Sequence, residues 1–243
     1  MLFRCIRAEL IKLRRSFIWI IFLILPVISA VMGCFNYLQN LEILTSQWYS
    51  LWTQVTLFYS NFFFPPLIAV YCSYLWRLEN FNHNRNALFT SPIPISTLYM
   101  SQFLAIAAIT LATQLWIGCL YLIIGLLIGL PGLPPAQILF WLLRGCIGGL
   151  AIAALQLLLS AVWRSFALPI AIALLAGVFG VVVSSAGYGL CFPYSLMLLG
   201  MNANRQEDML SGQAPLFYIS CFLFVLLFLT AGIQYLKRTD VKA

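Results

Sequence analysis

Apolar residues dominate six long stretches of the chain, which short polar segments separate. The stretches cover residues 17–36, 51–76, 99–130, 137–163, 167–187 and 216–236. A helix needs about 20 apolar residues to cross a bilayer core. Runs such as FIWIIFLILPVISAVMG are too long for barrel strands, and the strict alternation that barrels require is absent. The pattern predicts an all-α integral membrane protein with six transmembrane helices.

Composition supports this fold class. Hydrophobic residues make up 63% of the 243 and charged residues only 8%, whereas soluble domains carry about a quarter charged residues. The mean hydropathy is +0.99. No repeat, linker or soluble segment divides the sequence, so residues 1–243 are predicted to form one transmembrane domain. The first apolar stretch exceeds a signal-peptide core, and we expect it to remain as a span.

Basic residues indicate the orientation. With the N-terminus inside, eleven Lys and Arg residues face the cytoplasm, Arg205 faces outside and Arg144 lies within a span. This bias predicts that both termini are cytoplasmic. Topology also accounts for the net charge of +7, so no nucleic-acid partner is expected.

Residues 1–16 are predicted to form an amphipathic helix. Its apolar side chains share an arc of about 100°: Leu2, Phe3, Ile6, Leu10, Leu13 and Phe17. The basic side chains occupy the rest of the circumference. Such a helix lies flat in the cytoplasmic interface and contacts membrane lipids. A plain positive anchor before the first span is the alternative, and we favour the interfacial helix.

Prolines interrupt the second span. Pro65 and Pro66 remove helical hydrogen bonds near mid-membrane and are expected to kink or break the helix, while Asn61 is placed to satisfy a freed carbonyl. The bend either is simply packed or lines a path or cavity.

Small residues and one arginine mark the later spans. Gly145 and Gly149 have the GxxxG spacing that allows close helix approach, and the small residues of the fifth span predict that it is buried in a bundle or between subunits. Arg144 is expected either to snorkel outward or to line a polar surface between helices, and we favour snorkelling.

Residues 188–215 begin apolar but are too short to span. They predict a re-entrant or interface-lying hairpin on the outer side, and a solvated loop is the alternative. The hairpin would present polar residues near the membrane surface: Tyr194, Asn202, Asn204, Arg205, Glu207 and Asp208.

No catalytic or metal-binding motif is found. The chain lacks GxxxxGK[ST], HExxH and GxSxG, its sole histidine is His83, and its seven cysteines have no metal-ligand spacing. No enzyme activity, cofactor or metal is therefore expected in this chain. Since no carboxylate lies within a span, secondary transport is disfavoured, although the Pro65–Pro66 break keeps it open. Uphill transport would then draw energy from a partner.

Residues 77–98 form the main polar loop. On a helical wheel Leu78, Phe81 and Leu88 share one side, and Glu79 and His83 lie opposite. The segment SPIPIS that follows is predicted to be rigid and extended, and it connects the loop to the third span. The loop predicts a short amphipathic cytoplasmic helix that docks on a cytosolic protein or lies on the membrane.

Two passages carry a family resemblance. RAELIKLRRSFIW enters the first span, and a spaced set precedes the third: Glu79, Asn84, Arg85, Leu88 and Pro92. Together they resemble permease subunits of ABC exporters of the second class, found in the bacterial plasma membrane. The chain length and the passage PYSLMLLG resemble the lantibiotic-immunity and bacitracin-resistance permeases. Asn82, His83, Asn84 and Asn86 depart from the small or basic residues expected in the loop.

The resemblance implies the following roles and partners. The loop would be a coupling helix that docks on a separate ATPase through Glu79, Phe81, His83, Arg85 and Leu88. Residues 1–16 would be an elbow helix with Arg4, Arg7, Glu9, Lys12, Arg14 and Arg15. Two ATPase subunits would carry ATP and Mg, and a second permease, identical or paralogous, would complete the exporter. The expected cargo is an amphipathic antimicrobial peptide. A non-transporting assembly factor or sensor partner, or a permease for another substrate, is the alternative.

The outer surface supplies the candidate substrate contacts. The spans show little mid-membrane polarity, but aromatic and acidic residues gather at the outer ends: Glu42, Trp48, Tyr49, Trp52, Tyr188, Tyr194, Glu207 and Asp208. The aromatics either are interfacial anchors or receive the apolar face of a cationic peptide. Of this group, Glu42, Trp48, Trp52, Tyr194, Glu207 and Asp208 are the candidate contacts.

Overall fold

The computed structural model describes residues 1–14, 16–81, 92–205 and 207–238, and every regular element in these ranges is helical. The helices are α1 (Leu2–Arg14), α2 (Ile18–Gln39), α3 (Trp48–Phe58), the π-helical η1 (Tyr59–Phe63), α4 (Phe64–Asn80), α6 (Ile95–Leu127), α7 (Gln137–Val162), α8 (Ala167–Ser185), the 3-10 turn η3 (Gly189–Cys191), α9 (Pro193–Gly200) and α10 (Ala214–Arg238). Six described segments are long and apolar enough to cross a membrane, with Trp48–Asn80 counted as one. The six predicted spans are confirmed, with ends that differ by a few residues.

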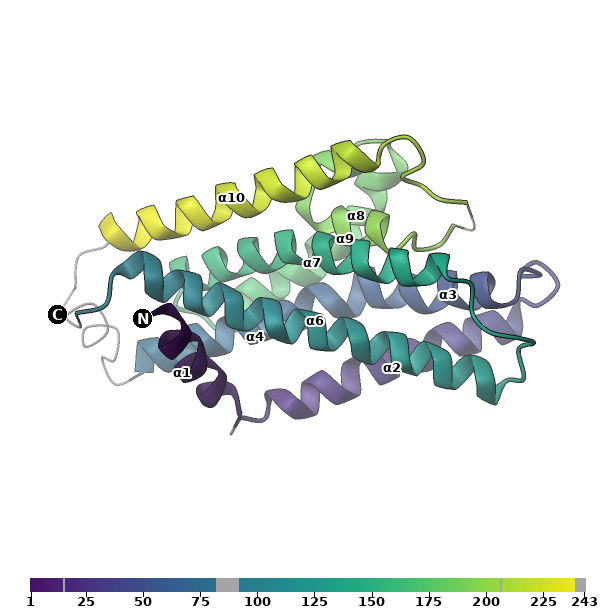
Figure 1. Cartoon of the computed structure of the whole chain (residues 1–243), viewed down its shortest axis with the longest axis horizontal. Helices are drawn as coiled ribbons and strands as arrows, with labels where there is room; N and C mark the ends of the chain where they lie inside the picture. The colour runs from purple at the N-terminus through teal and green to yellow at the C-terminus, as the bar shows by residue number, and fades with distance from the viewer. Residues whose placement is uncertain (15, 82–91, 206, 239–243) are drawn as a thin grey trace.

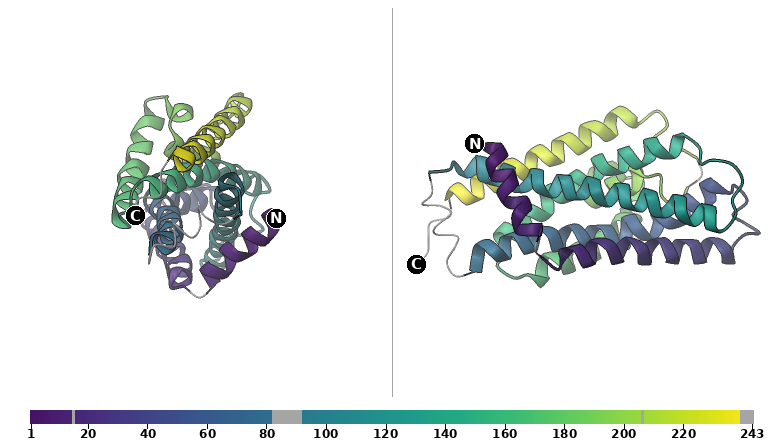
Figure 2. Two further views of the ribbon diagram at one scale, coloured as in Figure 1. Left: turned by 90° about the vertical axis from the view of Figure 1, so that its left-hand side faces the viewer. Right: turned by 60° about the horizontal axis from the view of Figure 1, so that its bottom comes forward.

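The spans form an elongated bundle, and α1 crosses one end of it (Figures 1 and 2). The same end carries the last turn of α10, the ends of α4 and α7 and the starts of α6 and α8. We name it the basic end, because it holds Arg4, Arg7, Lys12, Arg14, Arg77, Arg164, Lys237 and Arg238. The opposite end, here the far end, holds residues 40–47, 128–136 and 186–213.

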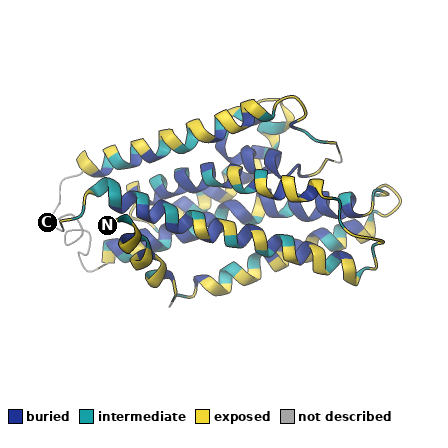
Figure 3. Ribbon diagram, in the orientation of Figure 1, coloured by how far each residue is buried: buried dark blue, intermediate teal, exposed yellow. Residues whose placement is uncertain are grey.

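α7 lies at the centre of the bundle, where it packs against α4, α6, α9 and α10. Buried residues accordingly fill the interior, and the outward faces of α2 and α10 are exposed (Figure 3). α8 lies at the edge of the bundle and is only partly buried within the chain, whereas its small residues predict burial in a bundle or between subunits. Its buried residues form one stripe: Pro169, Ala173, Gly177 and Gly180. Small residues allow one face of α8 to approach η1 and α9, and the remaining faces point outward.

Glycines of α7 allow the close packing of α9. A Cβ atom at Gly148 would lie 2.6 Å from the Leu196 carbonyl oxygen, and one at Gly200 would lie 2.7 Å from the Arg144 oxygen. Gly149 is similarly close to Phe64, at 2.8 Å. The predicted close approach at the GxxxG segment is confirmed. It holds all of α9 buried, because backbones without side chains between them can touch.

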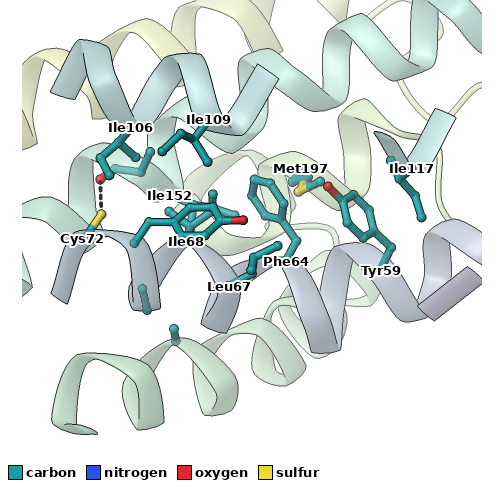
Figure 4. Packing of buried hydrophobic residues seen from close by; sticks show 14 of the residues in the cluster. Tyr59, Phe64, Leu67, Ile68, Cys72, Ile106, Ile109, Ile117, Ile152 and Met197 are labelled. Carbon is teal, nitrogen blue, oxygen red and sulfur yellow. Dashed lines mark hydrogen bonds between the residues drawn. The ribbon is translucent and has the colours of Figure 1, made fainter. Parts of the chain in front are cut away.

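The proline pair in the second span produces a change of helix type. Pro65 and Pro66 begin α4, and the residues before them adopt the wider π-helix η1. Asn61 Nδ2 donates a hydrogen bond to the Leu57 carbonyl at 2.8 Å. This side-chain bond supplies a donor to a carbonyl where the regular helical hydrogen bonds are interrupted. Tyr59 and Phe64 on either side of the change belong to the apolar core (Figure 4). The interruption is therefore packed on the side of Tyr59 and Phe64, whereas Phe62, Phe63 and Pro66 line an apolar groove on the other side.

The interior of the spans is more polar than the sequence suggested. The fold buries neutral polar side chains between helices: Gln54, Asn61, Gln102, Thr110, Thr113, Gln114 and Gln156. Gln156 Nε2, for example, donates a hydrogen bond to the Tyr194 hydroxyl at 2.6 Å. Counting charges along the spans missed this, because amides and hydroxyls carry none yet still need partners away from water.

Candidate functional site at the basic end

α1 is fixed against the bundle by its turn into α2. The Ser16 hydroxyl and the Trp19 indole nitrogen both donate to the Leu13 carbonyl, at 2.7 and 3.0 Å. These bonds satisfy a carbonyl that the end of α1 leaves open. α1 then packs along α6 and reaches α4. The turn thus brings one face of a short helix onto the end of a span that is distant in sequence.

The packed face of α1 carries a charged contact that we name the Lys12 clamp: Glu9, Lys12 and Glu79. The Lys12 ammonium donates to Glu9 Oε1 at 2.8 Å and to Glu79 Oε1. Glu9 is 2% exposed and Glu79 is 5% exposed, while the Lys12 side chain is 31% exposed. The clamp therefore joins α1 to the last turn of α4 with two buried carboxylates and one half-buried ammonium.

The clamp has one more acidic group than basic groups, and this governs its electrostatics. Burial raises the pKa of Glu9, and the Lys12 charge and hydrogen bond oppose the rise. For Lys12, burial lowers the pKa, but the attraction of Glu9 and the hydrogen bonds to both carboxylates outweigh it, so the pKa is raised. Glu9 Oε2 is buried without a hydrogen-bond partner. Burial therefore disfavours the anionic form of Glu9.

Glu79 is a correction to the predicted coupling helix. We expected it on a polar face toward an ATPase, but α4 extends to Asn80 and α1 covers Glu79. Phe81 follows α4 and is 63% exposed. His83, Arg85 and Leu88 lie outside the described residues. The predicted 77–98 loop is also shorter than expected, because its last residues, from Ile95, belong to α6.

The elbow residues divide between two faces. Arg4, Arg7 and Arg14 are exposed, and Arg15 lies outside the described residues. Glu9 is buried, although its assignment to the charged residues of the elbow helix predicts an exposed side chain. The protein-facing stripe is Cys5, Glu9 and Leu13, whereas Phe3 in the predicted apolar arc is 86% exposed. Glu9 is the one acidic residue in this basic helix, and that was the sequence signal that it pairs with a residue of the same chain.

At the far end, the structure corrects three candidate substrate contacts. Trp48, Trp52 and Tyr194 are buried within the bundle. The Trp48 and Trp52 indoles donate to backbone carbonyls of Pro131 and Met201 at 2.9 and 2.7 Å. They belong to the packing between the spans and the connections of the far end, so they form no surface belt. Tyr188 is exposed and Tyr49 is half-buried.

The contact between Arg144 and Asp208 contradicts the roles that the sequence predicts for both residues. Arg144 Nη1 contacts both Asp208 carboxylate oxygens, at 2.9 and 3.1 Å, and Asp208 also accepts from the Leu210 amide. Arg144 is therefore a partner within the chain and not a snorkelling cation, and Asp208 is not a free acid. Asn202 is also buried, whereas Glu42 and Glu207 are exposed. The segment 188–215 thus consists of the buried α9 followed by turns tied to α7.

The site offers contacts and charge, without the elements of a catalytic centre. Within the described residues no group of three or more His, Cys, Asp or Glu side chains is placed to hold a metal. The cysteines at 5, 34, 72, 119, 146, 191 and 221 are free thiols. The clamp joins an amphipathic helix to the end of a span.

Six described helices are long and apolar enough to cross a membrane. The family described as ABC-2 family transporter protein matches residues 5–180, and the chain belongs to this family. Family membership and the six apolar helices make it a multi-pass protein of the bacterial plasma membrane. The match spans α1 to most of α8. No curated protein matches the chain. Membership makes the chain the transmembrane permease component of an ABC transporter, and it implies partnership with ABC ATPase subunits.

Proposed function

We propose that the chain is the permease subunit of an ATP-driven exporter that expels amphipathic antimicrobial peptides, in lantibiotic self-immunity or peptide-antibiotic resistance. It pairs with a second permease, identical or paralogous, and with two ATPase subunits that carry ATP and Mg. Family membership supports the permease role. The observation that carries the coupling part is the Lys12 clamp, which fixes α1 to α4 directly before residues 82–91.

The orientation follows from charge. Among the described residues, the exposed charges of the basic end are all cationic: Arg4, Arg7, Arg14, Arg77, Arg164, Lys237 and Arg238. The two acids described at this end, Glu9 and Glu79, are buried in the clamp. Positive loops remain in the cytoplasm, so the basic end, with α1 as an elbow helix and both termini, faces the ATPase.

Coupling would run through the connection between the loop and α1. An ATPase that binds residues 81–94 displaces the end of α4, and the clamp passes this displacement to α1, which packs along α6. The exposed Phe81 ring is the described side chain of the loop best placed to enter an apolar ATPase groove. Glu79 holds the loop in position, and a direct contact with the ATPase is not required of it.

Substrate attraction at the far end rests on Glu42 and Glu207, which are both exposed. Exposed acidic residues attract a cationic peptide by well under 1 kcal/mol per pair, and salt weakens the effect. Glu42→Gln together with Glu207→Gln should lower protection against a cationic peptide, most clearly at low ionic strength. Full protection by this double variant would remove the acidic residues from the mechanism.

The test of the coupling role is co-purification from native membranes. The chain should bring down an ATP-binding protein, and Phe81→Asp should weaken this association because it places a charge in an apolar groove. Phe81→Leu is the matched control and should retain the partner. Association that survives Phe81→Asp unchanged would refute the docking role. ATPase activity that ignores candidate peptides would favour the non-transporting assembly or sensor role.

A further inference from the structure

An apolar groove opens on the outside of the bundle at its basic half. α2 forms one wall, α8 forms the other, and η1 with α4 forms the floor. The groove holds about 450 Å³ and is lined by Ile20, Ile21, Ile24, Leu25, Phe62, Phe63, Pro66, Val70, Ile170 and Leu174. All of these residues belong to spans, so hydrocarbon is the medium at the mouth of the groove.

The lining continues as two stripes that end in an arginine contact. Val70 and Arg77 are seven residues apart and share one face of α4, and Phe63, seven residues before Val70, is the last residue of η1. On α8 the stripe of Leu174 and Ile170 points back to Phe166, one turn earlier. The Arg77 guanidinium lies over the Phe166 ring, 5.6 Å from its centroid. The apolar groove therefore leads to a cation at its basic-end mouth.

A second arginine lies close to Phe166 in the sequence. Arg164 is two residues before Phe166 and is exposed, as is Arg77. Within the described ranges no salt bridge joins either arginine to an acid, and Glu9 and Glu79 are already held by Lys12. An apolar groove at membrane depth with unneutralised guanidinium groups above it is complementary to a molecule with an acyl chain and a phosphate.

We infer that the groove between α2, α4 and α8 binds an anionic phospholipid of the leaflet at the basic end. One acyl chain lies between Ile24 and Leu174, and the phosphodiester is bound by Arg77 and Arg164. Guanidinium groups match phosphate oxygens in charge and geometry, and basic pockets between spans are typical sites for anionic headgroups. The site goes beyond the exporter role and requires no particular cargo.

The test uses the full chain in vesicles of phosphatidylcholine that contain phosphatidylglycerol with a photoactivatable group on one acyl chain. Labelling should fall on peptides of α2, α4 and α8. The Arg77→Gln and Arg164→Gln double variant should reduce it by about fivefold for each arginine removed. Arg205→Gln, at the far end, is the matched charge control and should label as the wild type does. The same probe on phosphatidylcholine should label the groove weakly.

A second pair of variants tests the chain-binding part. Leu174→Trp fills the groove, whereas Leu175→Trp changes the neighbouring, 72% exposed position outside it. Labelling should drop with the first variant and persist with the second. Equal labelling by both lipids, or no loss in the arginine variant, would overturn the proposal. Efficient disulfide formation between two Leu174→Cys chains would also overturn it, by assigning the groove to a second copy. Labelling requires neither ATPase nor peptide, so its failure leaves the exporter role untouched.

Discussion

The two ends of the bundle each hold an ionic contact within the chain, and the contacts differ in charge balance. At the basic end one ammonium serves two buried carboxylates in the Lys12 clamp. At the far end Arg144 and Asp208 are matched one to one, with side chains 20% and 23% exposed. The clamp at the basic end therefore has one buried negative charge without a counter-charge, which is energetically costly. The Arg144–Asp208 pair at the far end has no such excess.

The same difference determines the surface of each end. Because the clamp buries the described acids of the basic end, that end presents cations to its surroundings. The far end presents Glu42, Arg205 and Glu207 together. The surface charge of each end therefore depends on which charges the fold buries, as well as on how many the sequence contains. A cationic surface suits anionic headgroups.

The largest expected effect comes from removing the single cation of the clamp. Lys12→Met leaves Glu9 and Glu79 buried without a counter-charge, which should destabilise the protein by about 3–5 kcal/mol. Lys12→Arg keeps the charge and should cost much less. Thermal unfolding in detergent, followed by tryptophan fluorescence, measures both variants. A melting temperature unchanged in Lys12→Met would remove the clamp from the stabilising contacts.

The far-end pair should show a smaller effect, because it is balanced and partly exposed. Arg144→Met should cost about 1–3 kcal/mol, and Asp208→Leu a similar amount, since each leaves a partly buried charge without its counter-charge. The double variant should recover part of the loss. A double-mutant cycle on the free energy of unfolding measures this coupling. Simple additivity of the two variants would show that the pair contributes nothing beyond its separate side chains.

The fold was predictable from the sequence where a single physical length, the thickness of the bilayer, determines an element. Bilayer thickness fixes the length of a span, so apolar stretches such as 137–163 and 167–187 located α7 and α8 to within two residues. Helical periodicity likewise located α1. The Lys12–Glu79 contact was not predictable, because it joins residues 67 positions apart. Only the packing of α1 against α4 brings them together.

The far end shows a second reason for failure. Aromatic residues near span ends are usually interfacial anchors, and by that rule Trp52 should be exposed. Its indole instead binds the Met201 carbonyl, in a segment 149 positions away. The polar stretch that follows α9 predicts a surface segment. Gly148 instead allows α9 to enter the bundle, and Asn202, which follows α9 directly, is buried with it. A one-dimensional pattern cannot distinguish lipid from protein as the apolar neighbour.

Close packing at the far end gives the third prediction. Gly148→Ala places a Cβ atom 2.6 Å from the Leu196 oxygen, so the backbones of α7 and α9 must separate, at a cost of about 1–3 kcal/mol. Gly118→Ala is the matched control, because its Cβ would meet a movable Leu142 methyl at 3.0 Å. Thermal unfolding should separate the two variants. Equal melting temperatures would mean that the close approach of α7 and α9 at Gly148 adds nothing to stability.

The smallest expected effect returns to the excess charge of the clamp and concerns pH. Burial raises the pKa of Glu9 above its ordinary value of 4.5, although Lys12 opposes the rise. The native state therefore binds this proton more readily than the unfolded chain does. Stability should increase as the pH falls from the raised pKa toward 4.5. The raised pKa of Lys12 acts above 10.5, outside this window.

Glu9→Gln isolates that proton. Glutamine keeps a side-chain oxygen for the Lys12 ammonium but cannot ionise, so the variant should be slightly more stable at neutral pH and lose the gain on acidification. Glu42→Gln, an exposed carboxyl at the far end, should retain the wild-type pH dependence. Urea unfolding at a series of pH values from 4.5 upward measures the three proteins. A wild-type pH slope in Glu9→Gln would place the titrating group elsewhere in the protein.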